Sequence, residues 1–319
     1  MPDDIATAPK LAPRKFQNPD ITADGLPRAV VALTHLKTLW FNTGTLCNLT
    51  CENCYIESSP ENDRLVYLSE AEVRQYLGEI KNDVLGVEEI GFTGGEPFMN
   101  PEIIGMIEAC LEKGFKVLIL TNAMKPLHHK RDDLAKLNSI YGERLRLRVS
   151  IDHHTKFRHE QLRGSGSWSP MIEDLKWLSE NSMNIAAAGR TCWIEDDHPE
   201  RSAYAALFAS EGIQIDAHDP MALVLFPEMD ERLDVPEITT SCWDILGVAP
   251  DSMMCATSRM VIKRKGAARP VVAPCTLIPY DPQFEMGHNL MDAATSVKLN
   301  HPHCARFCVL GGGSCSVTD

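Results

Sequence analysis

Short apolar runs and longer segments of helical periodicity alternate along the middle of the chain. The runs are rich in β-branched and other apolar residues and predict strands, at residues 37–42, 88–94, 115–122, 144–152, 183–190 and 213–219. The segments between them carry apolar residues at helical spacing and predict helices, at residues 69–82, 101–114, 130–142, 169–181 and 199–212. This alternation is typical of a parallel sheet with crossover helices.

The alternation also divides the chain into three parts. Residues 36–220 are predicted to form the α/β domain, a partial (β/α)6 barrel similar to a TIM barrel. Residues 1–35 are Pro-rich and show little periodicity, which predicts an N-terminal arm or a disordered lead. After residue 220 the alternation stops and Gly, Pro and Cys become more frequent. Residues 221–319 are therefore predicted to form a second, small domain.

The amino-acid composition limits the class of protein and the kinds of partner that fit this fold. With 44% hydrophobic and 24% charged residues, the chain reads as an ordinary soluble globular protein. The formal net charge of -13 argues against a nucleic-acid partner, because such binding draws on clustered Lys and Arg. No apolar run approaches the roughly 20 residues of a membrane helix, and no secretory signal is visible at the N-terminus. We therefore expect a cytoplasmic protein that binds neither membrane nor nucleic acid.

Eleven cysteines without a visible export signal favour metal binding or catalysis over disulfides. Three of them, Cys47, Cys51 and Cys54, directly follow the first predicted strand. They therefore lie in the first βα loop, at the end of a parallel barrel where active sites collect. Three thiolates can hold three irons of a [4Fe–4S] cluster and leave the fourth iron open for a ligand. A zinc knuckle with a distant fourth ligand is the alternative.

A glycine-rich motif, "GFTGGEPF" at residues 91–98, ends the second predicted strand. Gly94 and Gly95 allow a close approach of backbone to a ligand, and Glu96 offers an acceptor for a cationic amine. Together with the CxxxCxxC spacing one strand earlier, this motif resembles the radical S-adenosylmethionine (SAM) superfamily. The segments "LTNA" and "SIDHHTKFRHEQLRGSGSW" follow in the expected order on the third and fourth strands. The resemblance covers most of residues 38–220.

The resemblance implies a cofactor site. Cys47, Cys51 and Cys54 would bind the cluster, and the amino and carboxylate groups of SAM would chelate its free iron. The SAM-binding residues implied are Gly94, Gly95 and Glu96 for the methionine amine, Ser150 and Asp152 for the ribose, Arg163 for the methionine carboxylate, and Tyr55 beside the cluster. An electron from a donor such as flavodoxin or ferredoxin would then cleave SAM to methionine and a 5′-deoxyadenosyl radical.

Three features differ from the family pattern. His153 and His154 replace the Gly-Pro pair that usually follows the fourth strand, and the next loop, up to Arg163, is one residue longer. Asn53 stands where an aromatic residue or His is frequent, and Ala123 stands where Gly is common.

The late cysteines predict a second site. Residues 255–275 read as a β-hairpin with Gly266 near its turn and a cysteine at each end. The late cysteines resemble those of the SPASM extension, or of its shortened form Twitch, and they are Cys255, Cys275, Cys304, Cys308 and Cys315. This resemblance implies one auxiliary [4Fe–4S] cluster on four of the five, with the spare one left open. A structural zinc site is the alternative.

Four residues at predicted strand ends are candidate proton acceptors: His153, His154, Asp216 and His218. The predicted reaction is SAM cleavage followed by hydrogen abstraction from a small-molecule or natural-product substrate, as a two-electron oxidation assisted by the auxiliary cluster. We favour this substrate class because 35 residues cannot build the N-terminal recognition domain frequent in peptide-modifying members. A peptide- or protein-modifying maturase is the first alternative. A non-catalytic zinc or iron–sulfur scaffold is the second, and the Gly-Gly-Glu-Pro run argues against it.

Overall fold

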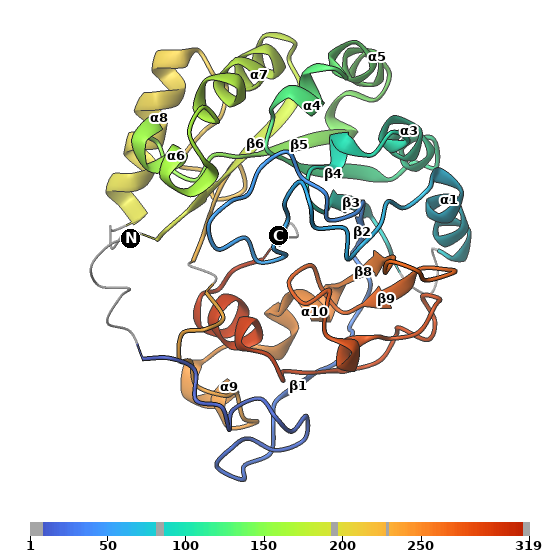
Figure 1. Ribbon diagram of the computed structural model, residues 1–319, viewed down its shortest axis with the longest axis vertical. Helices are drawn as coiled ribbons and strands as arrows, with labels where there is room; N and C mark the ends of the chain where they lie inside the picture. Colours follow the sequence, from blue (N-terminus) through green and yellow to red (C-terminus); the bar gives the residue numbers. More distant parts are fainter. Residues whose placement is uncertain (1–8, 81–85, 193–196, 228–229, 315–319) are drawn as a thin grey trace.

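A single eight-stranded sheet forms the centre of the computed structural model, which describes residues 9–80, 86–192, 197–227 and 230–314 (Figure 1). The strand order is β7-β6-β5-β4-β3-β2-β8-β9. Six neighbouring strands run parallel and form the partial barrel: β2 (Thr38–Asn42), β3 (Glu89–Thr93), β4 (Lys116–Thr121), β5 (Leu145–Ser150), β6 (Asn184–Arg190) and β7 (Leu223–Phe226). The α/β class and the partial barrel are confirmed.

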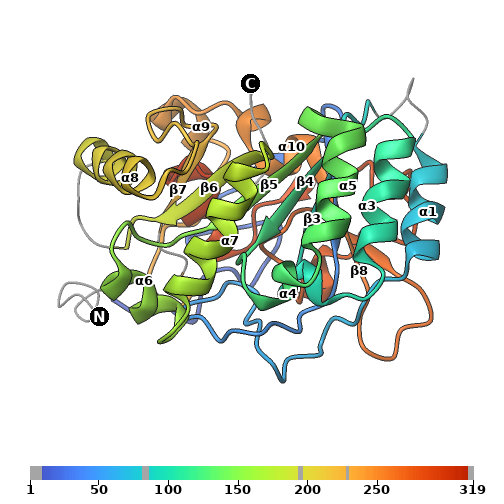
Figure 2. The same ribbon diagram turned by 90° about the horizontal axis from the view of Figure 1, so that it is seen from above.

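Helices cover the outer face of these strands, and the C-terminal region lies on the other side (Figures 1 and 2). The helices between the strands are α1 (Glu70–Glu79), α3 (Ile103–Glu112), α4 (Lys125–His128), α5 (Arg131–Tyr141), α6 (Lys156–Arg163), α7 (Trp168–Glu180) and α8 (Asp197–Glu211). Alternate residues of each strand enter the core against the helices, as Leu145, Leu147 and Val149 of β5 do. The intervening residues, such as Arg148 and Ser150, face the barrel interior because side chains alternate along a strand.

The sixth strand is where the prediction fails. Residues 213–219 form no strand, and β7 takes the sixth place four residues further on. Ile213, Ile215 and Ala217 are buried, so their alternation imitates a strand, but the backbone turns at Asp219, whose N–H donates to the Asp216 carbonyl. The parallel sheet thus continues past residue 220. The division into domains stays a prediction.

The predicted hairpin is confirmed, and it extends the barrel sheet. Strand β8 (Ser258–Ile262) pairs antiparallel with β9 (Val271–Ala273), and Gly266 in the turn has a φ of +80°. On its other edge β8 pairs in parallel with β2. The remaining elements of this region are α9 (Cys242–Leu246), α10 (Met254–Thr257), β10 (Val297–Lys298) and a π-helical segment at Cys304–Leu310. Short 3-10 turns lie at Pro97–Met99, Gly142–Arg144, Pro250–Ser252 and Pro282–Phe284.

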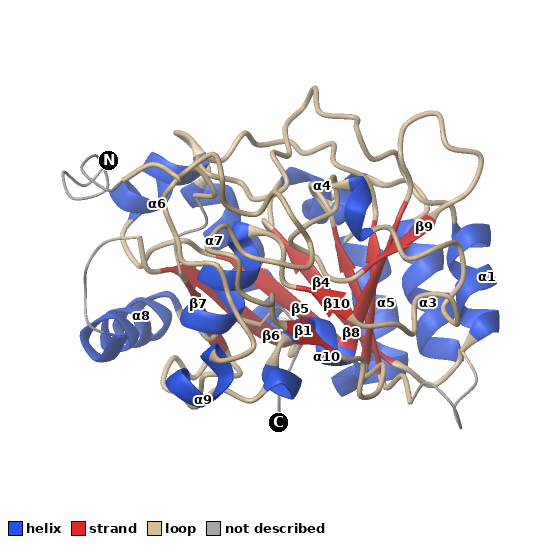
Figure 3. Ribbon diagram, turned by 90° about the horizontal axis from the view of Figure 1, so that it is seen from below, coloured by secondary structure: helices blue, strands red, loops and turns tan. Residues whose placement is uncertain are grey.

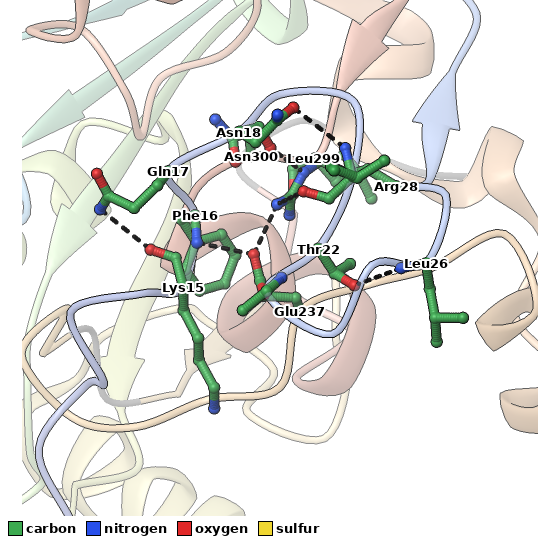
Figure 4. A network of polar contacts seen from close by, with 12 residues as sticks. Lys15, Phe16, Gln17, Asn18, Thr22, Leu26, Arg28, Glu237, Leu299 and Asn300 are labelled. Atoms are coloured by element: carbon green, nitrogen blue, oxygen red, sulfur yellow. Dashed lines mark hydrogen bonds and ion pairs between the residues drawn. The ribbon is translucent and has the colours of Figure 1, made fainter.

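Residues 9–35 are not a disordered lead. They run along the C-terminal region, and β1 (Val30–Val31) pairs with β10. Arg28 binds Glu237 at 2.6 Å, and the Phe16 backbone N–H donates to the same carboxylate (Figure 4). The residues that order this segment lie more than 200 positions away in the sequence. Its conformation therefore does not depend on a local helix or strand pattern, and the sequence shows no periodicity there.

Figure 3 shows the strands gathered at the centre, with helices around them and long loops crossing the remaining surface. Within the described ranges, no helix has both the length and the apolar character needed to cross a membrane.

Candidate active site

The loop after β2 carries the first cysteine cluster at the carboxyl edge of the sheet. Cys47 is buried, whereas Cys51 and Cys54 are half-buried. None of the ten described cysteines forms a disulfide, and Cys315 lies outside the described residues. Burial raises the pKa of the Cys47 thiol to about 12, and the Glu96 carboxylate adds to the rise. A thiol in this position becomes a thiolate readily only when a metal cation balances its charge.

The Gly-Gly-Glu-Pro run holds this loop in place through its backbone. The Gly95 N–H donates to the Gly44 carbonyl at 2.8 Å, and the Glu96 N–H donates to the Leu46 carbonyl at 3.2 Å. A Cβ on Gly95 would lie 2.1 Å from the Leu46 oxygen, so no larger residue fits without moving the loop. Gly94 adopts a φ of +142°, which L side chains rarely tolerate. The two glycines therefore set the position of the chain just before Cys47.

A cavity of about 170 Å³ lies beside the loop, at the carboxyl ends of the strands. It brings together all but one of the predicted cofactor residues, namely Cys47, Cys51, Cys54, Tyr55, Gly94, Gly95, Ser150, Asp152 and Arg163. Arg148 and Arg190 also line it. Leu277 and Phe307 reach it from the C-terminal region, which thereby forms part of the wall.

The charged wall of the cavity centres on Asp152. The Arg163 Nη2 donates a hydrogen bond of 3.0 Å to Asp152 Oδ1, its Nε forms an ion-pair contact of 2.9 Å with Oδ2, and Arg190 lies 4.0 Å from the same carboxylate. Burial alone would raise the pKa of Asp152, but the charges of Arg163 and Arg190 lower it below its usual range. Asp152 is therefore ionised at neutral pH, and Arg163 is fixed at the cavity wall.

Glu96 is the predicted cofactor residue that does not line the cavity. Its buried carboxylate accepts hydrogen bonds from the Thr121 hydroxyl and the Asn122 N–H, both at 2.8 Å, and from the Phe98 N–H at 3.2 Å. Burial raises the pKa of Glu96 to about 7 although these bonds oppose the rise. The carboxylate thus ties the end of β3 to the end of β4. Its contact with the methionine amine stays a prediction.

Asn122 is a site residue that sequence reasoning missed. Its side-chain amide lies 3.7 Å from the Cys47 sulfur and donates to Asn48 at 3.0 Å. The preceding residues of "LTNA" place it at the end of β4, but nothing in that motif indicates a contact with a cysteine. Ala123 and Asn53 have φ values of 48° and 51°. This left-handed conformation explains why glycine would suit position 123.

The four candidate proton acceptors do not line the cavity. His153 is buried below it and accepts from the Thr155 N–H at 2.9 Å, and its ring stacks against that of His154 with 3.9 Å between centroids. Asp216 accepts from the His218 N–H in the turn before β7. The structure brings neither pair to the cysteine loop.

A second, smaller cavity brings four late cysteines together. Cys255 and Cys275 come from the ends of the hairpin, and Cys304 and Cys308 come from the π-helical segment. All four are buried, and burial raises the pKa of Cys255 to about 11 and that of Cys304 further. The other lining residues are His303 and the apolar side chains of Met253, Met254, Leu277, Ile278, Val297 and Leu299. Four thiols that line one largely apolar cavity fit an iron–sulfur cluster with every iron bound by protein.

Comparisons with known proteins agree with this description. The fold and the first site define an α/β partial barrel with an open three-cysteine centre. The sequence model of the Radical SAM superfamily matches residues 41–192. This region, a little under half of the chain, is that of a radical SAM iron–sulfur enzyme, and the cofactors shared by that superfamily are a [4Fe–4S] cluster and SAM.

Two curated relatives match parts of the chain. The antilisterial bacteriocin subtilosin biosynthesis protein AlbA of Bacillus subtilis is 30% identical over 146 residues, which cover 44% of this chain and 30% of that protein. The GTP 3′,8-cyclase of Rhodococcus opacus is 35% identical over 109 residues, which cover 33% of this chain and 29% of that protein. The match therefore spans less than a third of the length of either relative.

Two solved structures share the fold. Streptococcus suis SuiB bound to S-adenosylmethionine superposes with a TM-score of 0.58 at 14% identity, covering 80% of this chain and 64% of that chain. The protein anSMEcpe with bound AdoMet gives a TM-score of 0.57 at 13% identity, covering 81% of this chain and 77% of that chain. At these identities the likeness concerns the fold.

Proposed function

We propose that this chain binds a [4Fe–4S] cluster through Cys47, Cys51 and Cys54 and cleaves SAM reductively in the adjoining cavity. The observation that carries the proposal is the convergence on one cavity of these cysteines, the Gly94–Gly95 backbone and the Asp152–Arg163 pair. Three cysteines leave one iron of such a cluster without a protein ligand. The Asp152 and Arg163 side chains supply one anionic and one cationic group for the rest of SAM.

The residues of the chain have distinct roles in this proposal. Gly94 and Gly95 let the cysteine loop pack closely against the end of β3, and their backbone would meet the methionine part of SAM at the cavity wall. Ser150 and Asp152 lie at the end of β5, where they would meet the ribose, and Arg163 would meet the carboxylate. Leu277 and Phe307 add apolar side chains to the cavity wall. When bound, the first cluster and SAM supply the 5′-deoxyadenosyl radical that removes a hydrogen atom from the substrate, and an auxiliary cluster offers an acceptor for the electron that remains.

We propose that Cys255, Cys275, Cys304 and Cys308 hold this auxiliary cluster. The four cysteines line one largely apolar cavity, which supports a four-cysteine site among the described residues. The proposed reaction is a two-electron oxidation, in which the substrate loses a hydrogen atom, then an electron and a proton. A flavodoxin or ferredoxin is the proposed donor for SAM cleavage.

The proposed substrate is a small molecule or natural-product intermediate. Arg148 and Arg190 on the cavity wall favour a substrate that carries an anionic group. A peptide substrate is the second candidate, and the match to the subtilosin biosynthesis protein AlbA favours it. Stimulation of 5′-deoxyadenosine formation by candidate small molecules, or by candidate peptides, separates the two.

The test of the proposal is iron and sulfide per chain after anaerobic reconstitution, measured in the wild type and in a Cys47/Cys51/Cys54→Ala variant. We expect about eight irons to fall to about four, with 5′-deoxyadenosine formed by the wild type alone. Zinc in place of iron would support the scaffold alternative. If about four irons bind and all are lost in the variant, the late cysteines hold no cluster.

A further inference from the structure

Arg259 is a buried cation beside the late cysteines, and no described carboxylate forms an ion pair with it. This residue of β8 is 1% exposed. Its guanidinium donates to four backbone carbonyls, those of Cys255, Ser258, Ala293 and Thr295, at 2.6 to 2.8 Å. Across the residues that the structure describes, no acidic side chain forms an ion pair with it. The titratable side chains that act on it electrostatically are those of Cys255 and Cys275.

A second buried arginine, Arg28, has a carboxylate partner. Arg28 also donates to carbonyls, those of Asn18, Ile21 and Leu299, but it binds the Glu237 carboxylate at 2.6 Å as well (Figure 4). A buried charge without an opposite charge costs several kcal/mol. Carbonyl dipoles solvate Arg259 but leave its net charge uncompensated. The compensating charge has to come from the neighbouring thiolates.

We propose that Arg259 is the counter-charge of an auxiliary iron–sulfur cluster held by Cys255, Cys275, Cys304 and Cys308, and that it raises the reduction potential of that cluster. This inference rests on the auxiliary cluster of the proposed function. Four thiolates leave a [4Fe–4S] centre with a net negative charge, and each added electron makes it more negative. A fixed positive charge therefore stabilises the reduced form more than the oxidised form, and net charge is among the factors that set cluster potentials. The bond to the Cys255 carbonyl makes Arg259 a positioning residue for one ligand as well.

The test isolates the auxiliary site in the full-length Cys47/Cys51/Cys54→Ala background. Three further variants are compared there by iron content and by redox titration of the reduced-cluster EPR signal: Arg259→Gln, Arg259→Lys and Arg131→Gln. Arg131 is a matched control, since it pairs with Asp174 beside α5, away from both cysteine sites. At the midpoint potential of the parent, we expect the reduced-to-oxidised ratio to fall about tenfold in Arg259→Gln, which is a shift of about 59 mV for one electron. Arg259→Lys and Arg131→Gln should stay near the parent.

The outcomes separate this inference from the proposed function. If the parent holds no iron, the auxiliary cluster and the role of Arg259 are both overturned. If Arg259→Gln keeps its iron with an unchanged potential, only the role of Arg259 is overturned. If Arg259→Gln fails to fold, Arg259→Lys decides, because it keeps the charge while losing most of the carbonyl bonds. If Arg259→Lys holds the cluster at a potential near that of the parent, the result supports the counter-charge role of Arg259. If Arg259→Lys loses the iron, that role is overturned.

Discussion

The two cysteine sites differ in where their ligands come from and in what surrounds them. Cys47, Cys51 and Cys54 lie on one loop, two of them half-buried, beside a cavity with charged walls. The four described late cysteines, Cys255, Cys275, Cys304 and Cys308, come from a hairpin and a π-helical segment and are buried in a largely apolar shell. Three ligands and an open cavity suit a centre that binds a reactant, whereas four ligands in a closed shell suit a centre that only stores charge or stabilises the fold.

The largest expected effect comes from replacing a single cysteine in one site or in the other. Cys51→Ser should lower 5′-deoxyadenosine formation by at least about 1,000-fold, or about 4 kcal/mol of transition-state stabilisation, because the cluster that carries the chemistry is lost. Cys304→Ser should leave SAM cleavage within about tenfold of the wild type while the auxiliary irons are lost. Assays of 5′-deoxyadenosine and iron on both variants check this. Equal loss of SAM cleavage in both would mean that the two sites do not work separately.

The same contrast explains what the sequence could predict. The first site is local: its cysteines fall within eight positions and the glycine pair ends the next strand, so spacing alone indicated it. The second site depends on contact between a hairpin that ends near Cys275 and a segment that begins at Cys304, about thirty positions later. The sequence shows the candidate cysteines but does not show which of them meet. Asn122 and Arg259 were missed because their partners are set by tertiary contacts.

Errors in the fold have the same origin. Ile213 and Ile215 alternate as strand residues do, yet they pack from a turn, and the apolar run ending at Phe226 forms the strand. Residues 9–35 lack periodicity because Glu237 and β10 order them from the far end of the chain. The pairing of β8 with β2 likewise depends on a contact that no local pattern encodes.

The next effect concerns the ion pair of the open site. Asp152→Asn should lower the free energy of unfolding by about 3–5 kcal/mol, since it leaves Arg163 buried without its partner. Glu211→Gln, which removes an exposed pair with Lys176, should cost less than about 1 kcal/mol and serves as the control. Urea unfolding measures both. A loss at Asp152 no larger than at Glu211 would show that the pair does not fix the wall of the cavity.

The pH dependence of Asp152 has a definite sign. Its pKa in the folded chain lies below the ordinary value of 3.8, so its stabilising contribution is present above that value. The contribution is lost as the pH falls through the lowered pKa. Between pH 5 and pH 3 the wild type should therefore lose more stability than Asp152→Asn does.

A smaller effect is expected at the glycine that supports the first loop. Gly95→Ala should cost about 1–3 kcal/mol of stability, because its Cβ would overlap the Leu46 carbonyl, and it should displace Cys47 and lower SAM cleavage. Gly78→Ala is the matched control. Its Cβ meets nothing within 4 Å in α1, so it should stabilise the chain by about 1 kcal/mol. Thermal unfolding and iron analysis of both variants measure these effects. Normal SAM cleavage by Gly95→Ala would show that the close contact between Gly95 and the Leu46 carbonyl does not position Cys47.

The smallest effect should come from a residue outside both sites. Ser69 caps α1, with its hydroxyl accepting from the Glu72 N–H and the Glu72 carboxylate accepting from the Ser69 N–H. Ser69→Ala should cost about 1 kcal/mol. Because α1 supplies no cysteine, we expect the iron content and SAM cleavage to be unchanged at a temperature where the variant is folded. A loss of activity without unfolding would show that the open site responds to general weakening of the barrel, and the losses expected in Cys51→Ser and Gly95→Ala would then not report on the loop alone.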